Sequence, residues 1–154
     1  MLKDVPGWKL SEGCPGKVSV ASISGATTKC MQHHIKAFIG KSPDCIIVHA
    51  GTNDLVLDKT PEKIADDVVS LAIIVSSANI TPVISGLVPR GDRCRQKAFK
   101  VNSILQRQCA DRNIAFVDNS NINANAHLNR SRLHLNAKGA KLLTKNFSRY
   151  INKR

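Results

Sequence analysis

Four short apolar segments alternate along this chain with longer segments in which apolar residues recur at helical spacing. The short segments have the length and composition of strands buried on both faces, and they span residues 18–21, 45–49, 82–85 and 114–117. Strands that alternate with helices predict a parallel sheet with right-handed crossovers, so the pattern indicates an α/β fold.

The helical segments carry recognisable start signals and inward-facing stripes. One helix follows the Gly25–Thr28 turn and runs to about Ile39, and a second begins at Thr60, a good N-cap, with Pro61 at the first helical position. A third covers about residues 94–112, and Asn136 caps the last. The predicted inward-facing residues are Met31, Ile35 and Phe38; Ile64, Val68, Leu71 and Val75; Ala98, Val101, Leu105 and Cys109; and Leu142, Leu143, Phe147 and Ile151.

The length of 154 residues predicts one domain with a substantial core. Residues 1–17 are rich in Gly and Pro and read as an irregular lead-in, so we place the domain at residues 18–154. A loop of about twenty residues follows the fourth predicted strand, which is long enough to suggest a function.

The positive charge is concentrated in one half of the chain. Residues 1–89 hold 8 Lys and Arg against 8 Asp and Glu, whereas residues 90–154 hold 15 against 3 and account for the whole net charge of +12. A basic half of this kind can attract nucleic acid, although a solvated surface is the commoner reading. The sequence shows no Arg-rich run and no aromatic interleaving that would mark a dedicated nucleic-acid surface.

Other classes of protein are excluded by simple counts. No apolar run approaches the roughly 18 residues that span a bilayer, and the first residues do not form a signal peptide. The five cysteines are odd in number and contain no Cys-x-x-Cys pair, which argues against a disulfide framework or a zinc site. We therefore expect an intracellular protein without a metal or cofactor, in which Cys45 and Cys109 are small core residues.

Each residue with catalytic chemistry follows a predicted strand. Gly51 and Asn53 come directly after residues 45–49, Gly25 follows the first strand, and His134 lies in the long loop after the fourth. Because exit loops of parallel strands share one edge of the sheet, these residues can converge there. The Asn53 amide can donate a hydrogen bond to a developing oxyanion, and His134 can act as a general base.

Each of these residues also has a simpler reading. Asn53 can close a turn through its side chain, and Gly25 can supply a positive φ angle. A histidine in a loop more often has no catalytic role than acts in catalysis. Among the other histidines, we expect His33 and His34 at the surface and His49 as a hydrogen-bonded core residue.

Three blocks together resemble the SGNH (GDSL-type) hydrolase superfamily. Ser24-Gly25-Ala26-Thr27-Thr28 is similar to its glycine block, Gly51-Thr52-Asn53-Asp54 to its asparagine block, and His134, with Leu135-Asn136 and Gly139 after it, to its histidine block. The sequence in and around these blocks is most similar to SGNH domains in animal non-LTR retrotransposon open reading frames. The resemblance implies a three-layer α/β/α flavodoxin-like fold and an esterase acting on a small ester substrate. It makes Gly25 and Asn53 oxyanion donors, His134 the general base, and Gly51 and Asp54 supporting residues.

Two departures from the family pattern affect this expectation. No Gly-Asp-Ser occurs, so the chain holds no nucleophile of the family type, and Met1-Leu2-Lys3-Asp4 resembles the residues that follow that block. We therefore expect an N-terminally truncated domain with four strands, because the first, central strand of the family is absent. The family places Asp three residues before its histidine, and here that position is Ser131, which cannot stabilise an imidazolium as a carboxylate does.

Three hypotheses follow from these departures. The chain is a truncated SGNH-like domain with little or no esterase activity, or it belongs to a longer product that supplies the serine and is an intact esterase. The third hypothesis is a non-catalytic basic module that binds nucleic acid or self-associates in a retroelement particle. Ser22 and Ser24 lie near the relevant edge, but neither has the fixed turn that a nucleophile needs to meet its base. The oligomeric state is open.

Overall fold

A parallel sheet of three strands forms the centre of the molecule. The computed structural model describes residues 10–12, 14 and 16–153. The strands are β1 (Cys45–Val48), β2 (Thr81–Ser85) and β3 (Ala115–Val117), and they lie in the order β1-β2-β3. Both pairings are parallel, with Ile47 opposite Val83 and Val83 opposite Ala115. The predicted parallel α/β sheet is therefore confirmed.

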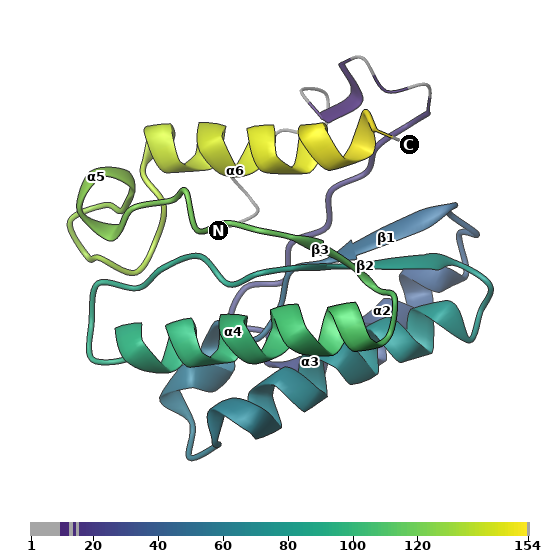
Figure 1. Ribbon diagram of the computed structural model, residues 1–154. Coiled ribbons are helices and arrows are strands. Elements are labelled where there is room, and N and C mark those ends of the chain that lie inside the picture. The colour runs from purple at the N-terminus through teal and green to yellow at the C-terminus, as the bar shows by residue number, and fades with distance from the viewer. Residues whose placement is uncertain (1–9, 13, 15, 154) are drawn as a thin grey trace.

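Helices cover both faces of this sheet and give three layers (Figure 1). One face carries α2 (Thr28–Ile39), α3 (Pro61–Ser76) and α4 (Arg95–Asp111), and the other carries α6 (Ala137–Ile151). Two short elements lie in the connections, the 3₁₀ helix η2 (Asn53–Val56) and α5 (Ala124–His127). The α/β/α layering predicted from the sequence is confirmed.

The helices begin where the sequence predicts, because local capping bonds fix their first turns. The Thr60 side chain accepts from the Lys63 amide with Pro61 at the first helical position, and Asn136 accepts from the Gly139 amide. The predicted inward-facing residues of α3 and α4 are all buried, at 2 % exposure or less. On α2, Ile35 is buried and Phe38 is only partly covered.

Each face of the sheet has its own apolar core. One cluster joins the sheet to α3 and α4 and includes Ile84, Leu87 and Leu105. The other joins the sheet to α6 and includes Val83, Leu143 and, from the lead-in, Leu10 at 3 % exposure. Part of the predicted lead-in therefore contributes to the core.

The expectation of a strand at residues 18–21 is wrong, and the described sheet has three strands rather than four. Only one side of the segment is covered, since Val18 and Val20 are half-buried against the core under α6 while Ser19 and Ala21 are exposed. A strand needs a partner for its backbone hydrogen bonds, and the segment has no partner strand among the described residues. The apolar side chains of the segment therefore pack against the core, while its backbone pairs with no strand of the described sheet.

The long connection after β3 is more ordered than the sequence predicts. It contains α5, and Leu128 forms an isolated antiparallel bridge with Leu135. This bridge closes a narrow hairpin that carries His134. No helix among the described residues is long and apolar enough to cross a membrane.

Two glycine substitutions should separate packing from helix propensity. At Gly139, in the first turn of α6, an added Cβ would overlap the carbonyl oxygen of His127. Gly139→Ala should therefore lower the free energy of unfolding by about 1–3 kcal/mol, although alanine is the better helix former. Urea denaturation measures the change.

Gly40→Ala is the matched control for this substitution. Gly40 ends α2 with φ −61°, and its added Cβ would lie 3.6 Å from the nearest atom, the Lys36 carbonyl oxygen. Alanine fits this conformation and should stabilise the fold by about 0.4–1 kcal/mol through the unfolded state. Equal effects of the two substitutions would contradict the close packing of α6 on the His127 backbone.

Candidate active site

The segments that carry the predicted chemistry meet at the carboxyl edge of the sheet. Residues 51–54 follow β1, residues 86–92 follow β2, and residues 118–136 follow β3, while residues 22–27 lead into α2. These loops are joined by hydrogen bonds between residues that lie far apart in the sequence. The loops at this edge are therefore in contact with one another, and the bonds show which pairs of loops touch.

A buried carboxylate ties the glycine block to the asparagine block. Asp54 is fully buried, and its two oxygens accept from the Thr28 amide at 2.9 Å and the Thr28 hydroxyl at 2.8 Å. Lys59 donates to the same carboxylate at 2.6 Å and to Asp67 at 2.9 Å. Partial burial opposes the charge on Lys59, but the bonds to Asp54 and Asp67 prevail and raise its pKa. Asp54 thus fixes the start of α2 against the turn after β1.

The amide of Asn53 is held beside the Gly25 turn by a second tie. Asn53 is exposed, and its Nδ2 donates to the Ala26 carbonyl oxygen at 2.8 Å. A side-chain amide has two N–H groups, and the second one on Asn53 has no partner among the described residues. Gly25 has φ +70°, and Gly51 has φ +104° where the chain turns under α3. Both glycines therefore occupy conformations that other residues rarely adopt.

Arg90 and Gly91 connect the asparagine block to the histidine hairpin. Arg90 is 7 % exposed, donates to the Thr52 carbonyl oxygen at 3.4 Å, and forms a two-pronged ion pair with Asp92. That pairing lowers the pKa of Asp92. The Gly91 amide donates to the carbonyl oxygen of Arg132 at 2.9 Å, two residues before His134. The loop after β2 is thus the bridge between the two blocks.

His134 is presented to solvent at this edge. Its carbonyl oxygen accepts from the Asn129 amide at 2.8 Å, which holds the hairpin closed, and its side chain is exposed. Among the described residues no side chain hydrogen-bonds the imidazole. Ser131, at the family Asp position, instead donates to Asn129 Oδ1 at 2.6 Å and accepts from the Leu133 amide at 3.4 Å. Ser131 is therefore part of the hairpin turn.

No serine of the described chain combines access with a base. Ser22 and Ser24 are exposed, and neither hydroxyl bonds a histidine within the described residues. Ser85 does meet a histidine, since its Oγ lies 3.0 Å from His49 Nδ1, but Ser85 is fully buried and closed to substrate.

A polar network that sequence reasoning missed lies under α6. His49, Ser85 and Asn119 each stand at or just after the end of a strand, and Asn119 donates to Ser85 Oγ at 2.9 Å and to the Gly86 carbonyl oxygen at 2.6 Å. Asn146 of α6 donates to Asn119 at 2.9 Å. The position of Asn119 directly beyond a strand was a signal for this role. The predicted hydrogen bonding of His49 is confirmed, although its ring is half-buried and not part of the fully buried core.

The environment of His49 disfavours its charged form. The ring is half-buried and packs edge-on against Phe147, with centroids 6.2 Å apart. Burial lowers the pKa of His49 to about 4. His49 is therefore a neutral member of the core network at physiological pH.

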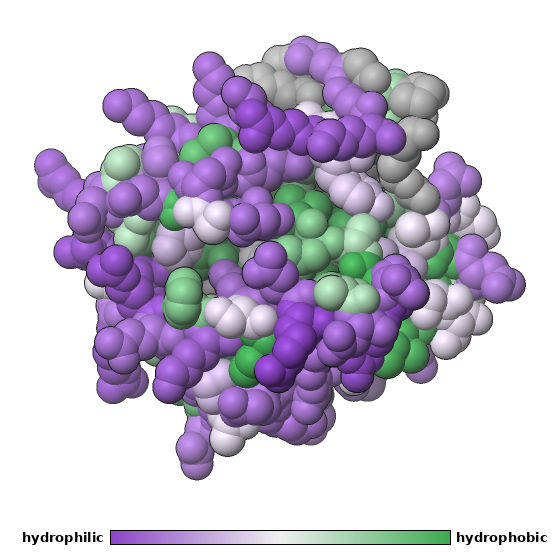
Figure 2. Space-filling model, viewed as in Figure 1, coloured by the Kyte–Doolittle hydropathy of each residue, from purple (hydrophilic) through white to green (hydrophobic). Residues whose placement is uncertain are grey.

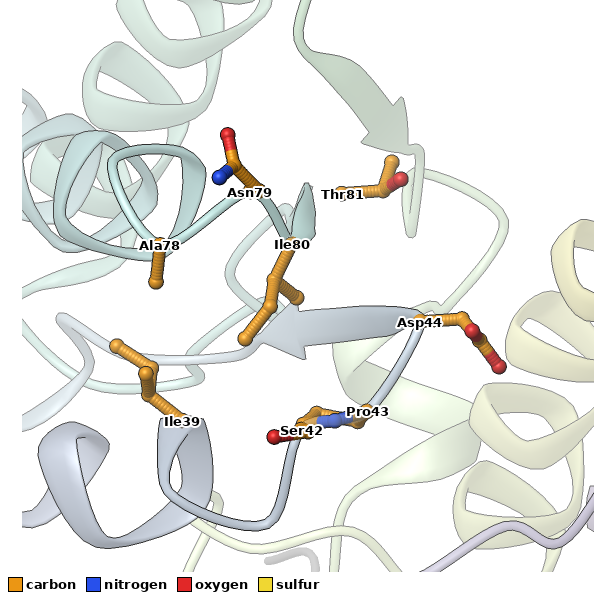
Figure 3. A pocket seen from close by; sticks show the side chains of 8 residues that line it. All are labelled: Ile39, Ser42, Pro43, Asp44, Ala78, Asn79, Ile80 and Thr81. Atoms are coloured by element: carbon orange, nitrogen blue, oxygen red, sulfur yellow. The ribbon is translucent and has the colours of Figure 1, made fainter.

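A hollow at the opposite edge of the sheet is separate from these residues (Figure 3). It is lined by the C-terminal turns of α2 and α3 and by the starts of β1 and β2, including Ile39, Asp44 and Asn79, and its volume is about 600 Å³. Within the described part of the chain, no three His, Cys, Asp or Glu side chains form a group that could hold a metal ion. The loops at the carboxyl edge are the stronger candidate site because they gather the amide, glycine and histidine.

Comparisons with known proteins agree with this architecture. The sequence profile of the GDSL-like Lipase/Acylhydrolase family matches residues 3–142. The chain is similar to a solved lipase/acylhydrolase from Enterococcus faecalis, with 20% identity, a TM-score of 0.81, and coverage of 100% of this chain and 86% of that one. It is also similar to a GDSL-like lipase from Bacteroides thetaiotaomicron, with 19% identity, a TM-score of 0.77, and coverage of 86% and 74%.

A third similar structure is a catalytic mutant of an acetylxylan esterase from Geobacillus stearothermophilus, with 18% identity, a TM-score of 0.74, and coverage of 92% of this chain and 77% of that one. At these identities the solved structures show a shared fold. No curated protein matches the chain.

Removing the Asp54 carboxylate should loosen both blocks of the site. Asp54→Asn leaves Lys59 without its closest partner and weakens the bond to the Thr28 amide, so the free energy of unfolding should fall by about 2–4 kcal/mol. Hydrogen exchange at the Thr28 amide should rise in parallel. Asp58→Asn, an exposed acid in the same loop, is the control and should change stability by less than about 0.5 kcal/mol. Similar effects of the two substitutions would rule out the anchoring role.

The low pKa of His49 makes stability depend on pH. Unfolded His49 takes up a proton near its ordinary pKa of 6.5, whereas folded His49 does so only near 4. Its contribution is therefore fully present above pH 6.5 and is lost between pH 6.5 and 4, with a slope approaching about 1.4 kcal/mol per pH unit.

Denaturation curves across this range should show a shallower pH slope for His49→Gln than for the native chain. His33→Gln, at an exposed position, should retain the native slope. If His49→Gln kept the native slope as well, the neutral state of His49 in the fold would be disproved.

Proposed function

Since the chain belongs to the GDSL-like lipase/acylhydrolase family, we propose that it is an esterase-like domain whose remaining site binds the carbonyl group of a small ester. The observation that carries the proposal is the hydrogen bond from Asn53 to Ala26, which holds the Asn53 amide beside the Gly25 turn. The Gly25 N–H and the second N–H of Asn53 are the donors that we assign to the developing oxyanion. Preorganised donors of this kind stabilise a tetrahedral intermediate.

His134 is the proposed general base. In the complete reaction a serine oxygen attacks the ester carbonyl carbon, and His134 takes the serine proton. The tetrahedral oxyanion then collapses, the bond to the leaving alkoxide breaks, and His134 returns the proton to that alkoxide. Water repeats the sequence on the acyl-serine and releases the acid. Ser131, bonded to Asn129, is assigned no part in orienting the imidazole.

We further propose that this chain by itself hydrolyses esters slowly or not at all. It contains no Gly-Asp-Ser, Ser22 and Ser24 make no contact with a histidine among the described residues, and Ser85 is closed to solvent. Loss of the nucleophile removes nearly all of the covalent contribution, on the order of 10⁶ in rate. The alternative is that a serine from a longer product completes the site.

Two expectations from the sequence stay predictions beside this proposal. They are the likeness to SGNH domains of retrotransposon reading frames and an intracellular location. A nucleic-acid partner for the basic residues 90–154 is a separate hypothesis, which the geometry of the ester site does not address.

A paired experiment tests the proposal and its alternative. The chain as it stands should neither react with a fluorophosphonate probe nor hydrolyse p-nitrophenyl acetate above background. An extended chain with a strand and Gly-Asp-Ser ahead of Met1 should gain both activities. In the extended chain, Asn53→Ala should lower kcat by about 10²–10³-fold, and His134→Ala by on the order of 10⁶-fold.

Asn152→Ala, at the far end of α6, is the control in the extended chain and should keep full activity. Labelling of the original chain that disappears in Ser22→Ala or Ser24→Ala would show that the nucleophile is already present. An extended chain indifferent to Asn53→Ala would remove the assigned oxyanion donor.

A further inference from the structure

One aromatic side chain stands out from the surface of α4. Phe99 is 74% exposed, more than any other exposed large hydrophobic residue of the described chain. The buried stripe of α4 consists of Ala98, Val101, Leu105 and Cys109, so Phe99 takes no part in the core. An exposed phenyl ring without a covering partner is a candidate contact for another molecule.

The neighbours of Phe99 on the helix are cationic or polar. Arg95, Gln96 and Lys100 line a shallow pocket together with Phe99, with a volume of about 390 Å³. Further along the same side of the helix lie Ser103 and Arg107, both exposed. We call these six residues the Phe99 face. Read along the sequence they do not form a nucleic-acid motif, but the helix gathers them into one surface.

The acid of α3 that contacts α4, Asp66, lies on the other side of this helix. Lys97 donates to the Leu55 and Leu57 carbonyl oxygens, and Gln108 donates to Asp66 of α3, so these two residues mark the side that faces α3 and η2. At about 100° per residue, Phe99 is turned by roughly 180–200° from both. Residues 95–110 contain no Asp or Glu. The Phe99 face therefore holds three cations, Arg95, Lys100 and Arg107, and the one acid of its own helix is the last residue, Asp111.

We propose that the Phe99 face binds single-stranded nucleic acid, with a base stacked on Phe99 and phosphates against Arg95, Lys100 and Arg107. A ring for stacking beside cations for the backbone is the combination that single-strand binders use. Arg95 and Arg107 are separated by about 18 Å of helix, which leaves room for more than one phosphate. Gln96 lines the same pocket as Phe99, and its amide can hydrogen-bond the edge of a stacked base. A duplex offers this face only its phosphates, because its bases are stacked inside.

The composition of α4 argues against a lipid surface as the partner. A helix that binds a membrane presents a broad apolar face, and the apolar face of α4 is buried in the core. Its exposed surface carries one phenyl ring among polar residues. Figure 2 shows a largely hydrophilic surface over α4 and α6, with apolar residues gathered in the hollow between them. This inference does not depend on the ester chemistry.

The α6 helix supplies an internal comparison. It carries a stripe of exposed cations, Lys138, Lys141, Lys145 and Arg149, and its aromatic residues Phe147 and Tyr150 are buried and half-buried. If charge alone drew the nucleic acid, the two helices would contribute alike. If stacking contributes, α4 should contribute more than α6, and removing the Phe99 ring should weaken binding although no charge is lost.

Fluorescence anisotropy of the whole chain with a short labelled oligoadenylate tests the proposal. Phe99→Ala should weaken binding at least about fivefold, the lower end of the contribution of one stacked base. The same variant should leave the affinity for a duplex unchanged. Arg95→Gln with Lys100→Gln should weaken binding to both and reduce the slope of log affinity against log salt for the single strand by about 1.4.

Two matched controls complete the experiment. Ile73→Ala removes an exposed apolar side chain from α3, and Lys141→Gln with Arg149→Gln removes two charges from α6. Ile73→Ala should weaken single-strand binding less than Phe99→Ala does. The α6 double variant should weaken it less than Arg95→Gln with Lys100→Gln does. Circular dichroism should confirm that all variants fold. An unchanged affinity in Phe99→Ala, an equal loss in the α6 variant, or binding to phosphatidylserine vesicles but not to the oligoadenylate would overturn the proposal.

Discussion

The buried carboxylate of Asp54 is the constraint on which the candidate site depends. A charge without solvent contact is stable only when it is paired and hydrogen-bonded, and here Thr28 and Lys59 meet that need. Because Thr28 begins α2 and Asp54 follows β1, satisfying the carboxylate also fixes the Gly25 turn against the Asn53 turn. The position of the Asn53 amide is thus a consequence of burying its neighbour. The pairing of the buried Asp54 charge therefore determines where the exposed Asn53 amide lies.

A network of polar side chains lies at the same edge of the sheet, between the strand ends and α6. Under α6, the chain of bonds from His49 through Ser85 and Asn119 to Asn146 joins the ends of all three strands to the helix. Partly satisfied networks are costly in a low dielectric, so these side chains fix one arrangement of α6 on the sheet. They also explain why a Ser–His contact on its own does not make a catalytic pair: Ser85 is closed to solvent.

The two proposed functions lie on different parts of the molecule. The ester site is built from loops at the carboxyl edge and depends on a few directed hydrogen bonds. The Phe99 face lies on the solvent side of α4 and depends on charge and an exposed ring. A substitution in one should therefore leave the other intact.

Much of the fold could be predicted from the sequence because its signals are local. The caps at Thr60 and Asn136 and the buried stripes of α3 and α4 depend on residues within a few positions of one another. The glycine, asparagine and histidine blocks were likewise visible as short motifs. Residues 18–21 had the short apolar composition of the true strands, yet pairing requires a remote partner that no local pattern reveals. The partners of Asp54, the role of Asn119, the bridge through Arg90 and the exposure of Phe99 were also decided by tertiary structure. Hydrogen bonds and exposure depend on which distant segments share space, and only the folded chain determines that.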